Sequence, residues 1–289
     1  MNQSSNNLKD KVVEALIKTI DSSEHNDLVI KLSDGQLHAS KLILASRSDY
    51  FQTMFSAQRN FKENLNNEVS YNCKVIIMKP IIRYIYGSKI DISSLSCSDV
   101  IEVLDMLRIL MLEQAIFEVQ ELFKIQLREQ AFSINDCYQA YLLSETKRME
   151  NVMCLINSHF ARNMDVIISK NKEILTNLSE DSLYYILDYV KKIEDKFNIP
   201  TPSWLHLRKL NFIIHWLENK SSQIHLETKT KIKPYFKLEY FTVTELLNEV
   251  FNSKLFDQTE IFSAIETVHN KIMIENKKLK NNLEVILKM

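Results

Sequence analysis

The near absence of glycine limits what this chain can fold into more than any other feature of its sequence. Only Gly35 and Gly87 occur among 289 residues, whereas average usage of about 7% would supply roughly 20. Phosphate-cradling loops, dinucleotide-binding turns, nucleophile elbows and β-propellers each need several closely spaced glycines, because glycine adopts positive φ without steric cost. These architectures are therefore excluded for these residues. Few glycines and prolines, with abundant leucine, isoleucine, lysine and glutamate, predict a mostly helical protein.

Charge and cysteine usage indicate the compartment and exclude some partners. The 36 basic and 37 acidic residues are spread along the chain, so we expect no nucleic-acid partner, which would need a concentrated basic surface. The four cysteines form no CxxC pair, which favours reduced, mostly buried thiols in a cytoplasmic protein, with the nucleus left open. The polar N-terminus and the absence of a long uncharged apolar run predict no signal peptide, no membrane span and no membrane partner.

The first 127 residues mix helical and strand patterns. Apolar residues at helical spacing predict an amphipathic helix over 8–20. Alternation on both sides of Asp34-Gly35 predicts a tight β-hairpin over 28–39, because this dipeptide accepts positive φ. Further elements are expected in this order: one or two helices over 41–55, a strand over 68–71, a helical segment over 75–86, and helices over 100–110 and 112–126.

Two local signals mark expected helix boundaries in this region. Pro80 lacks an amide hydrogen, so we expect it to start, kink or end a helical turn. Ser98-Asp99, with Glu102 three residues after the aspartate, predicts a capping box for the helix over 100–110.

Beyond residue 127 the strand pattern disappears, and this change is our predicted domain boundary. Helical periodicity recurs over 134–143, 150–160, 165–168, 181–193, 204–217, 242–251 and 258–287. From Ile261 to Ile286 the apolar residues alternate four- and three-residue steps, with Glu275 and Asn282 as polar interruptions, which is coiled-coil spacing. We favour a final packed helix with a charged, frayed end, and a partner helix stays open as the alternative.

Taken together, the N-terminal segments resemble the signature of the BTB/POZ domain. The residues that carry the resemblance are Asp27–Ile30, Leu37–Phe51, Met54-Phe55, Arg83–Gly87 and the paired helices of Val100–Gln126. The resemblance implies an α+β fold, a small sheet flanked by helices, for residues 1–127. The sequence departs from the family pattern at Ser40, where histidine is usual, at Gly87, which comes one place early, and at Pro80, where the family has no proline. Serine at position 40 can still cap the helix that begins at Lys41.

The helical remainder resembles the BACK domain that follows BTB in many adaptor proteins. Asn135–Cys137 lie near its expected start, and Ile213–Leu217 look like its late tryptophan helix. This resemblance implies an all-α domain over 128–270, followed by a helical tail over 271–289. Residues 191–203, which contain two prolines, look like a loop that ordinary BACK domains lack.

The BTB resemblance implies a homodimer. In BTB domains the N-terminal helix crosses to the partner chain, so each helix buries its apolar stripe on the other subunit. The expected interface comprises Leu8, Val12, Val13, Leu16, Ile17 and Ile20, together with Asp27 and Lys41, which match an acidic and a basic residue that pair near the dimer seam. If that ion pair is buried, removing one partner should be more harmful than removing both. The alternative, which we favour less, is that the helix folds back onto its own chain.

The resemblance also implies a binding site for cullin-3. Cullin-binding BTB domains carry a hydrophobic-x-Glu element after the helix that ends here in Met54-Phe55, and Phe61-Lys62-Glu63 follows at the expected distance. The aromatic side chain would enter a groove on cullin-3, and the glutamate would make a polar contact. We expect Met54, Phe55, Phe61 and Glu63 to form this site. The alternative is that Phe61 packs on its own domain.

We therefore expect a non-catalytic adaptor, the substrate-recognition or scaffold subunit of a cullin-3 ubiquitin ligase. An unidentified protein target would bind the helical region or residues 191–203. Most such adaptors carry a target-binding module such as a Kelch propeller, which the glycine content forbids in these residues. The second hypothesis is a homodimeric scaffold or competitor that occupies cullin or BTB partners without delivering a substrate.

Catalytic chemistry has little support in the sequence. The seven histidines show no HxxxH or His/Cys spacing suited to a metal ion, and no serine lies between glycines as a nucleophile elbow requires. We expect no catalytic residue, no bound metal and no cofactor, and hence no enzyme.

Overall fold

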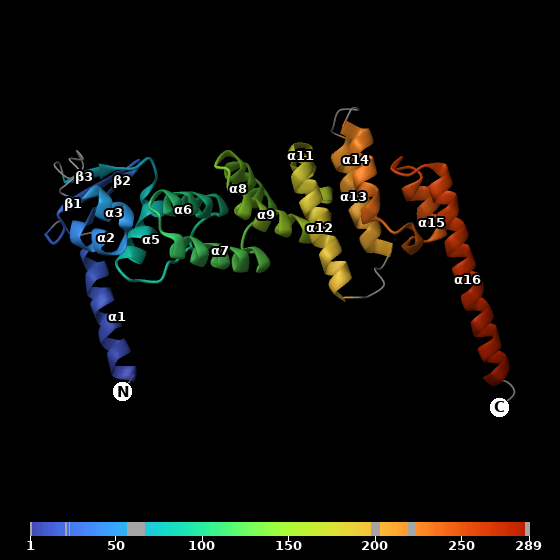
Figure 1. The fold of residues 1–289 in the computed structure, drawn as a ribbon, viewed down its shortest axis with the longest axis horizontal. Helices are drawn as coiled ribbons and strands as arrows, with labels where there is room; N and C mark the ends of the chain where they lie inside the picture. The colour runs from blue at the N-terminus through green and yellow to red at the C-terminus, as the bar shows by residue number, and fades with distance from the viewer. Residues whose placement is uncertain are drawn as a thin grey trace. The chain divides into compact units, whose positions relative to one another are not determined.

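The computed structural model describes residues 2–20, 22, 24–56, 67–197, 203–218 and 224–286. The chain divides into two compact units, Met1–Ile156 and Asn157–Met289, and each is described by itself. Among the described residues helices dominate, and the strands belong to the first unit (Figure 1).

The first unit opens with a helix and a three-stranded sheet. α1 spans Asn2–Thr19. β1 (Leu28–Leu32) and β2 (Gly35–Ala39) pair antiparallel as a tight hairpin, and β3 (Glu68–Ser70) runs parallel to β1 on its other side. The strand order is β2-β1-β3. This arrangement confirms the predicted hairpin and the short strand after residue 67.

Gly35 is needed for close packing and not for positive φ. Of the two glycines, Gly87 has positive φ, at 106°, so the expectation of positive φ in the hairpin turn is wrong. A Cβ atom at position 35 would lie 3.1 Å from Cγ2 of Val75. The Asp34 carboxylate accepts a hydrogen bond from the Val75 amide at 2.7 Å. The hairpin turn therefore packs against and caps the start of the next long helix.

Further helices complete the first unit: α2 (Lys41–Arg47), α3 (Asp49–Met54), α5 (Val75–Ile85), α6 (Cys97–Ile109), α7 (Glu113–Arg128) and α8 (Ile134–Thr146), while α9 (Glu150–Arg162) spans the division between the units. α8 packs on α6, where the thiols of Cys97 and Cys137 are hydrogen-bonded and the pKa of Cys97 is raised by this bond and by burial. The first compact unit therefore continues beyond residue 127, and the domain limits proposed from the sequence remain a prediction.

Helix α6 begins earlier than its predicted cap. Ser96 is the N-cap residue: its hydroxyl accepts a hydrogen bond from the Asp99 amide at 3.1 Å, and the Asp99 carboxylate accepts one from the Ser96 amide at 3.3 Å. The capping box predicted from Ser98-Asp99 is therefore wrong by about one turn. Ser96 is the favoured N-cap residue because Asp99 then stands at the third helical position, where its carboxylate reaches back to the N-cap amide.

Helix α5 runs without interruption through Pro80, which neither starts nor ends it. The buried face of α5 consists of Ile77, Met78, Ile81, Ile82 and Ile85. Pro80 lies on the opposite side, and burial of five large apolar side chains offsets the cost of a proline inside a helix.

The second unit is helical throughout its described residues. Its elements are α10 (Met164–Lys170), α11 (Lys172–Asn177), α12 (Glu180–Phe197), α13 (Ser203–Glu218), α14 (Ile224–Ile232), α15 (Val243–Glu245) and α16 (Gln258–Ile286), with 3₁₀ turns at Lys233–Tyr235 and Leu238–Tyr240 and a π-helical turn at Leu246–Val250. The sequence patterns did not predict α11 or α14. Trp216 of α13 is buried and donates a hydrogen bond from its indole to the Leu178 carbonyl at 2.9 Å.

Two expectations about the second unit are corrected or refined. The predicted loop over 191–203 is wrong for residues 191–197, which continue α12; residues 198–202 lie outside the described part. In α16, Ile261, Ala264 and Val268 are buried, whereas every residue from 269 to 280 is exposed. The first half of this helix is thus packed, and its coiled-coil spacing continues on an exposed second half.

Candidate protein-interaction surfaces

The C-terminal half of α1 is attached to its own chain. Ile20 is buried, and Val13 lies against Gly87, where a Cβ atom would be only 3.1 Å from Cγ2 of Val13. The Tyr86 hydroxyl accepts a hydrogen bond from the Ser40 amide at 2.7 Å and donates to Asn26 at 3.3 Å. Asn26 in turn donates to main-chain carbonyl oxygens at the end of α1. This network fixes the direction in which α1 leaves the domain.

The predicted apolar stripe of α1 is therefore divided. Ile20 is covered within one chain, Val13, Leu16 and Ile17 are half-buried, and Val12 is 51% exposed. The side chain of Leu8 lies outside the described part. On α2, Leu42 is 78% exposed. Among the described side chains of these two helices, Val12 and Leu42 are the large apolar ones that one chain leaves exposed.

Asp27 and Lys41 meet, but through the main chain of Lys41. The Asp27 carboxylate accepts a hydrogen bond from the Lys41 amide at 2.8 Å, which stabilises the first turn of α2. Ser40 occupies the N-cap position but its side chain makes no capping bond, so the expected serine cap is wrong. The Lys41 ammonium donates to Asn67 at 2.7 Å and lies 5.4 Å from the centre of the Phe55 ring. Asp27 is exposed, so the pair is not buried within one chain.

The end of α3 is anchored to the domain. Phe51 is buried, and the ring of Phe55 stacks on it with 5.8 Å between centroids. Met54 and Phe55 are half-buried. Phe61 and Glu63, the other two residues expected to contact cullin-3, lie outside the described residues. The structure thus places the start of the candidate site on a rigid support.

One apolar surface was missed in the sequence analysis. The buried face of α7 has a four-residue spacing, at Ala115, Val119, Phe123 and Leu127. Phe117 lies off this face and is 61% exposed. Ile125 of α7 and Met111, in the turn before α7, are exposed as well. Large apolar residues outside the buried stripe of an amphipathic helix were the signal that could have found this surface.

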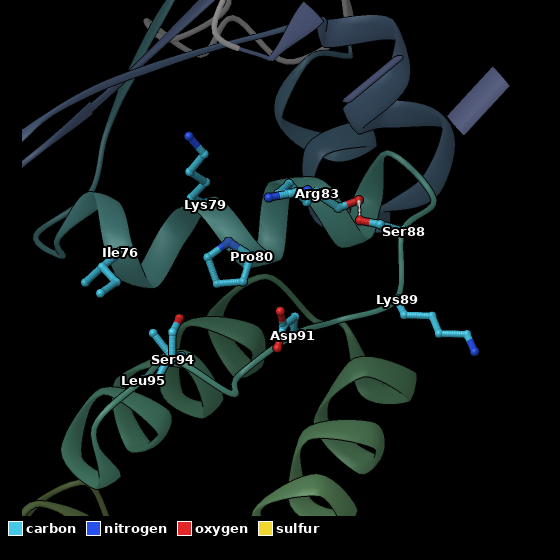
Figure 2. A pocket seen from close by; sticks show the side chains of 9 residues that line it. All are labelled: Ile76, Lys79, Pro80, Arg83, Ser88, Lys89, Asp91, Ser94 and Leu95. Atoms are coloured by element: carbon cyan, nitrogen blue, oxygen red, sulfur yellow. Dashed lines mark hydrogen bonds between the residues drawn. The ribbon is translucent and has the colours of Figure 1, made fainter. Parts of the chain in front are cut away.

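A pocket of about 370 Å³ lies between α5 and the segment that leads into α6 (Figure 2). Ile76, Pro80 and Arg83 contribute from α5, and Asp91 and Leu95 from the opposite wall. The sequence analysis singled out Pro80 as a departure from the BTB pattern but assigned it no role.

The sequence of the first unit matches that of a known family. The BTB/POZ domain matches residues 16–122, which contain the hairpin, β3, the helices α2, α3, α5 and α6, and most of α7. These residues form a BTB/POZ domain. The match confirms the resemblance that the sequence signature carries.

Curated proteins that match 62–90% of this chain carry BTB and Kelch names. This chain is 24% identical over 243 residues to Kelch-like protein 28 of mouse, a match that covers 75% of this chain and 42% of the relative. The chain is 25% identical over 282 residues to Kelch repeat and BTB domain-containing protein 1 of cowpox virus, a match that covers 90% of this chain and 46% of the relative. Kelch-like protein 40 of Xenopus laevis is 25% identical over 192 residues. The chain thus spans less than half the length of these relatives, and its C-terminal helices fit a BACK domain.

No group of three His, Cys, Asp or Glu side chains in the described part of the chain could hold a metal ion. No described helix has the length and apolarity needed to cross a bilayer. The BTB domain and the Kelch-like relatives support a protein-interaction role.

Proposed function

We propose that this protein is a subunit of a cullin-3 ubiquitin ligase, in which the BTB domain binds cullin-3 and another surface holds a protein target. The observation that carries the proposal is a hydrophobic-x-Glu sequence, Phe61-Lys62-Glu63, that begins six residues after the Met54-Phe55 end of α3 in a BTB domain. The stacking of Phe55 on Phe51 supports it, because a rigid support lowers the entropic cost of presenting a short binding element.

Binding of cullin-3 is tested with purified full-length chain and the cullin-3 N-terminal domain by isothermal titration calorimetry. An aromatic anchor at a small interface contributes 2 kcal/mol or more, so Phe61→Ala should weaken binding about 30-fold or more. Glu63→Ala should weaken it less. Matched controls are Phe262→Ala and Glu266→Ala on exposed positions of α16. Absence of binding, or binding that neither change at 61 or 63 weakens, would remove the ligase proposal.

We propose in addition that the BTB domain forms a two-fold homodimer through α1 and α2. Exposure of Val12 and Leu42 supports this arrangement, since both are large apolar side chains on the helices expected at the dimer seam. Sedimentation velocity at micromolar concentration should give a dimer, and Val12→Glu with Leu42→Glu should give a monomer. Val166→Glu on α10 is the matched control and should leave the dimer intact. A wild-type monomer under these conditions contradicts the proposal.

The composition favours a second candidate function, a scaffold or competitor that binds cullin or BTB partners without delivering a substrate. With two glycines, these 289 residues hold no Kelch propeller. Ubiquitin transfer onto a protein that co-purifies with the chain, in a reaction reconstituted with cullin-3, supports the adaptor. Inhibition of another BTB adaptor's ubiquitination without transfer supports the competitor. In either case we place the protein in the cytoplasm, with the nucleus open, and assign it no catalytic step of its own.

A further inference from the structure

The pocket beside α5 has an apolar floor on an otherwise solvent-facing side of the helix. The buried side of α5 faces the core, yet Ile76 on the outer side is 44% exposed. Ile76 and Pro80 are four residues apart, so they lie on one face of the helix. Leu95, which is buried, closes the floor from the segment before α6. In Figure 2 the ring of Pro80 points toward that segment.

Pro80 also changes the hydrogen-bonding capacity of this wall. In a regular helix the amide of residue 80 donates to the carbonyl oxygen of residue 76. Proline has no amide hydrogen, so the Ile76 carbonyl receives no bond from position 80. Position 80 therefore contributes a pyrrolidine ring and no hydrogen-bond donor to the apolar floor.

The rim of the pocket is mainly basic. Lys79, Arg83 and Lys89 line it, and among the described lining residues Asp91 is the one acidic side chain. The Asp91 carboxylate already accepts a hydrogen bond from the Ser93 amide at 2.9 Å, and this bond is the first cause of its lowered pKa. In Figure 2 the side chain of Lys79 extends from α5 away from Leu95, and that of Lys89 extends away from the other labelled residues.

We propose that this pocket docks a short extended segment of a partner protein in which acidic side chains flank one apolar side chain. The apolar side chain would lie on Ile76, Pro80 and Leu95, and the acidic ones would pair with Arg83 and Lys89. A volume of about 370 Å³ suits one large aliphatic side chain with its main chain. Charge complementarity selects this occupant over a neutral or basic segment. The site involves neither α1 nor Phe61 and Glu63, so the proposal stands or falls independently of cullin binding.

The test is a methyl NMR titration of the full-length chain, with the Ile76 methyl signal assigned through Ile76→Val. The probe is the peptide Gly-Ser-Glu-Glu-Leu-Glu-Glu-Ser-Gly. Two matched peptides replace every glutamate by lysine or the leucine by serine. The first peptide should shift the Ile76 signal saturably, with a dissociation constant of about 1 mM or tighter, and each matched peptide should bind at least tenfold more weakly.

Three variants connect any binding to the proposed residues. Arg83→Glu and Lys89→Glu should each weaken binding about tenfold or more, whereas Lys170→Glu, on exposed α10 in the second unit, should not change it. Pro80→Ala removes the pyrrolidine ring from the floor of the pocket and should also weaken binding, while alanine favours the helix.

Equal shifts with the lysine peptide, or binding that Arg83→Glu and Pro80→Ala leave unchanged, would overturn the proposal. A shift of Ile76 that depends on the concentration of the chain itself, without peptide, would instead assign the pocket to a second copy and would also overturn it.

Discussion

The two compact units differ in what they bury. Among the described residues of the first unit, the buried polar side chains are Ser48 and Ser144, and both hydroxyls donate to main-chain carbonyl oxygens. The second unit buries a larger and more polar set, Asn157, His159, Ser182, His206, Lys209 and Thr228. Burial of apolar surface stabilises both units, but the second also has to offset the desolvation of ionisable groups. Its stability should therefore depend more on pH and on single buried side chains.

The ionisable pair in α13 shows how the second unit accommodates such groups. The Lys209 ammonium donates to the Tyr235 carbonyl at 3.1 Å and lies 5.7 Å from the centre of the Phe236 ring. The His206 ring stacks on Tyr240 with 5.4 Å between centroids, and neither of its nitrogens has a hydrogen-bond partner among the described residues. Burial, with the nearby charges of Lys209 and Lys237, lowers the pKa of His206 to about 4.

The largest effect is expected from Trp216→Ala in the second unit. It creates a cavity and leaves the Leu178 carbonyl without its indole donor, so the unfolding free energy of this unit should fall by about 3–5 kcal/mol. Urea unfolding followed by near-ultraviolet circular dichroism measures the loss. The control Phe262→Ala removes an aromatic that is 62% exposed and should have little effect. If the first unit's transition moves equally, the two units unfold together and the comparison between them fails.

Acidification should weaken the second unit next most strongly. The unfolded chain binds a proton at His206 near pH 6.5, whereas the folded chain does so only near pH 4. Stability is therefore lost as the pH falls from about 6.5 to 4, by about 3 kcal/mol in total. His206→Phe should flatten this dependence, and His269→Gln, at an exposed position, should not. An unchanged pH profile in His206→Phe would show that another group controls it.

In the first unit, replacing a proline should raise stability, in contrast to the two losses expected in the second unit. Pro80→Ala supplies the missing amide inside α5 and should raise the unfolding free energy by about 1–3 kcal/mol. Pro234 provides the control, because it lies in the first turn of a 3₁₀ helix, where proline is tolerated. Pro234→Ala should change stability by less than about 1 kcal/mol. Destabilisation by Pro80→Ala, in thermal unfolding by calorimetry, would mean that the ring makes packing contacts worth more than the restored helix bond.

The smallest expected effect concerns the helix caps of the first unit. Ser96→Ala removes the hydroxyl of a complete capping box and should cost about 1 kcal/mol. Ser40→Ala removes a hydroxyl that makes no capping bond and should cost less than about 0.5 kcal/mol. The ratio of the two, measured by urea unfolding, tests whether Asp27 caps α2 in place of Ser40. Equal losses at positions 40 and 96 would contradict that assignment.

The success of the sequence analysis varied with how local each signal is. The hairpin over 28–39 and the helix after residue 75 were predicted correctly, because short-range alternation and periodicity follow from the geometry of the backbone. The predicted N-cap of α6 was wrong by about one turn, because two serines, Ser96 and Ser98, lie within three residues before Asp99. The loop predicted over 191–203 proved helical up to Phe197. The helical spacing of α12 continues through these residues, and the two prolines on which the loop prediction rested come after them, at positions 200 and 202.

The amino-acid sequence was sufficient to predict a mostly helical protein with a BTB/POZ domain. Glycine scarcity, helical periodicity and the spacing of the BTB signature are properties of neighbouring residues, and no packing information is needed to read them. The packing of the helices shows in addition that the Asp27 carboxylate accepts a hydrogen bond from the Lys41 amide. It also shows that the buried His206 ring has no hydrogen-bond partner among the described residues and that Pro80 forms part of the wall of a pocket. Each of these depends on side chains that are distant in the sequence and meet only when the helices pack.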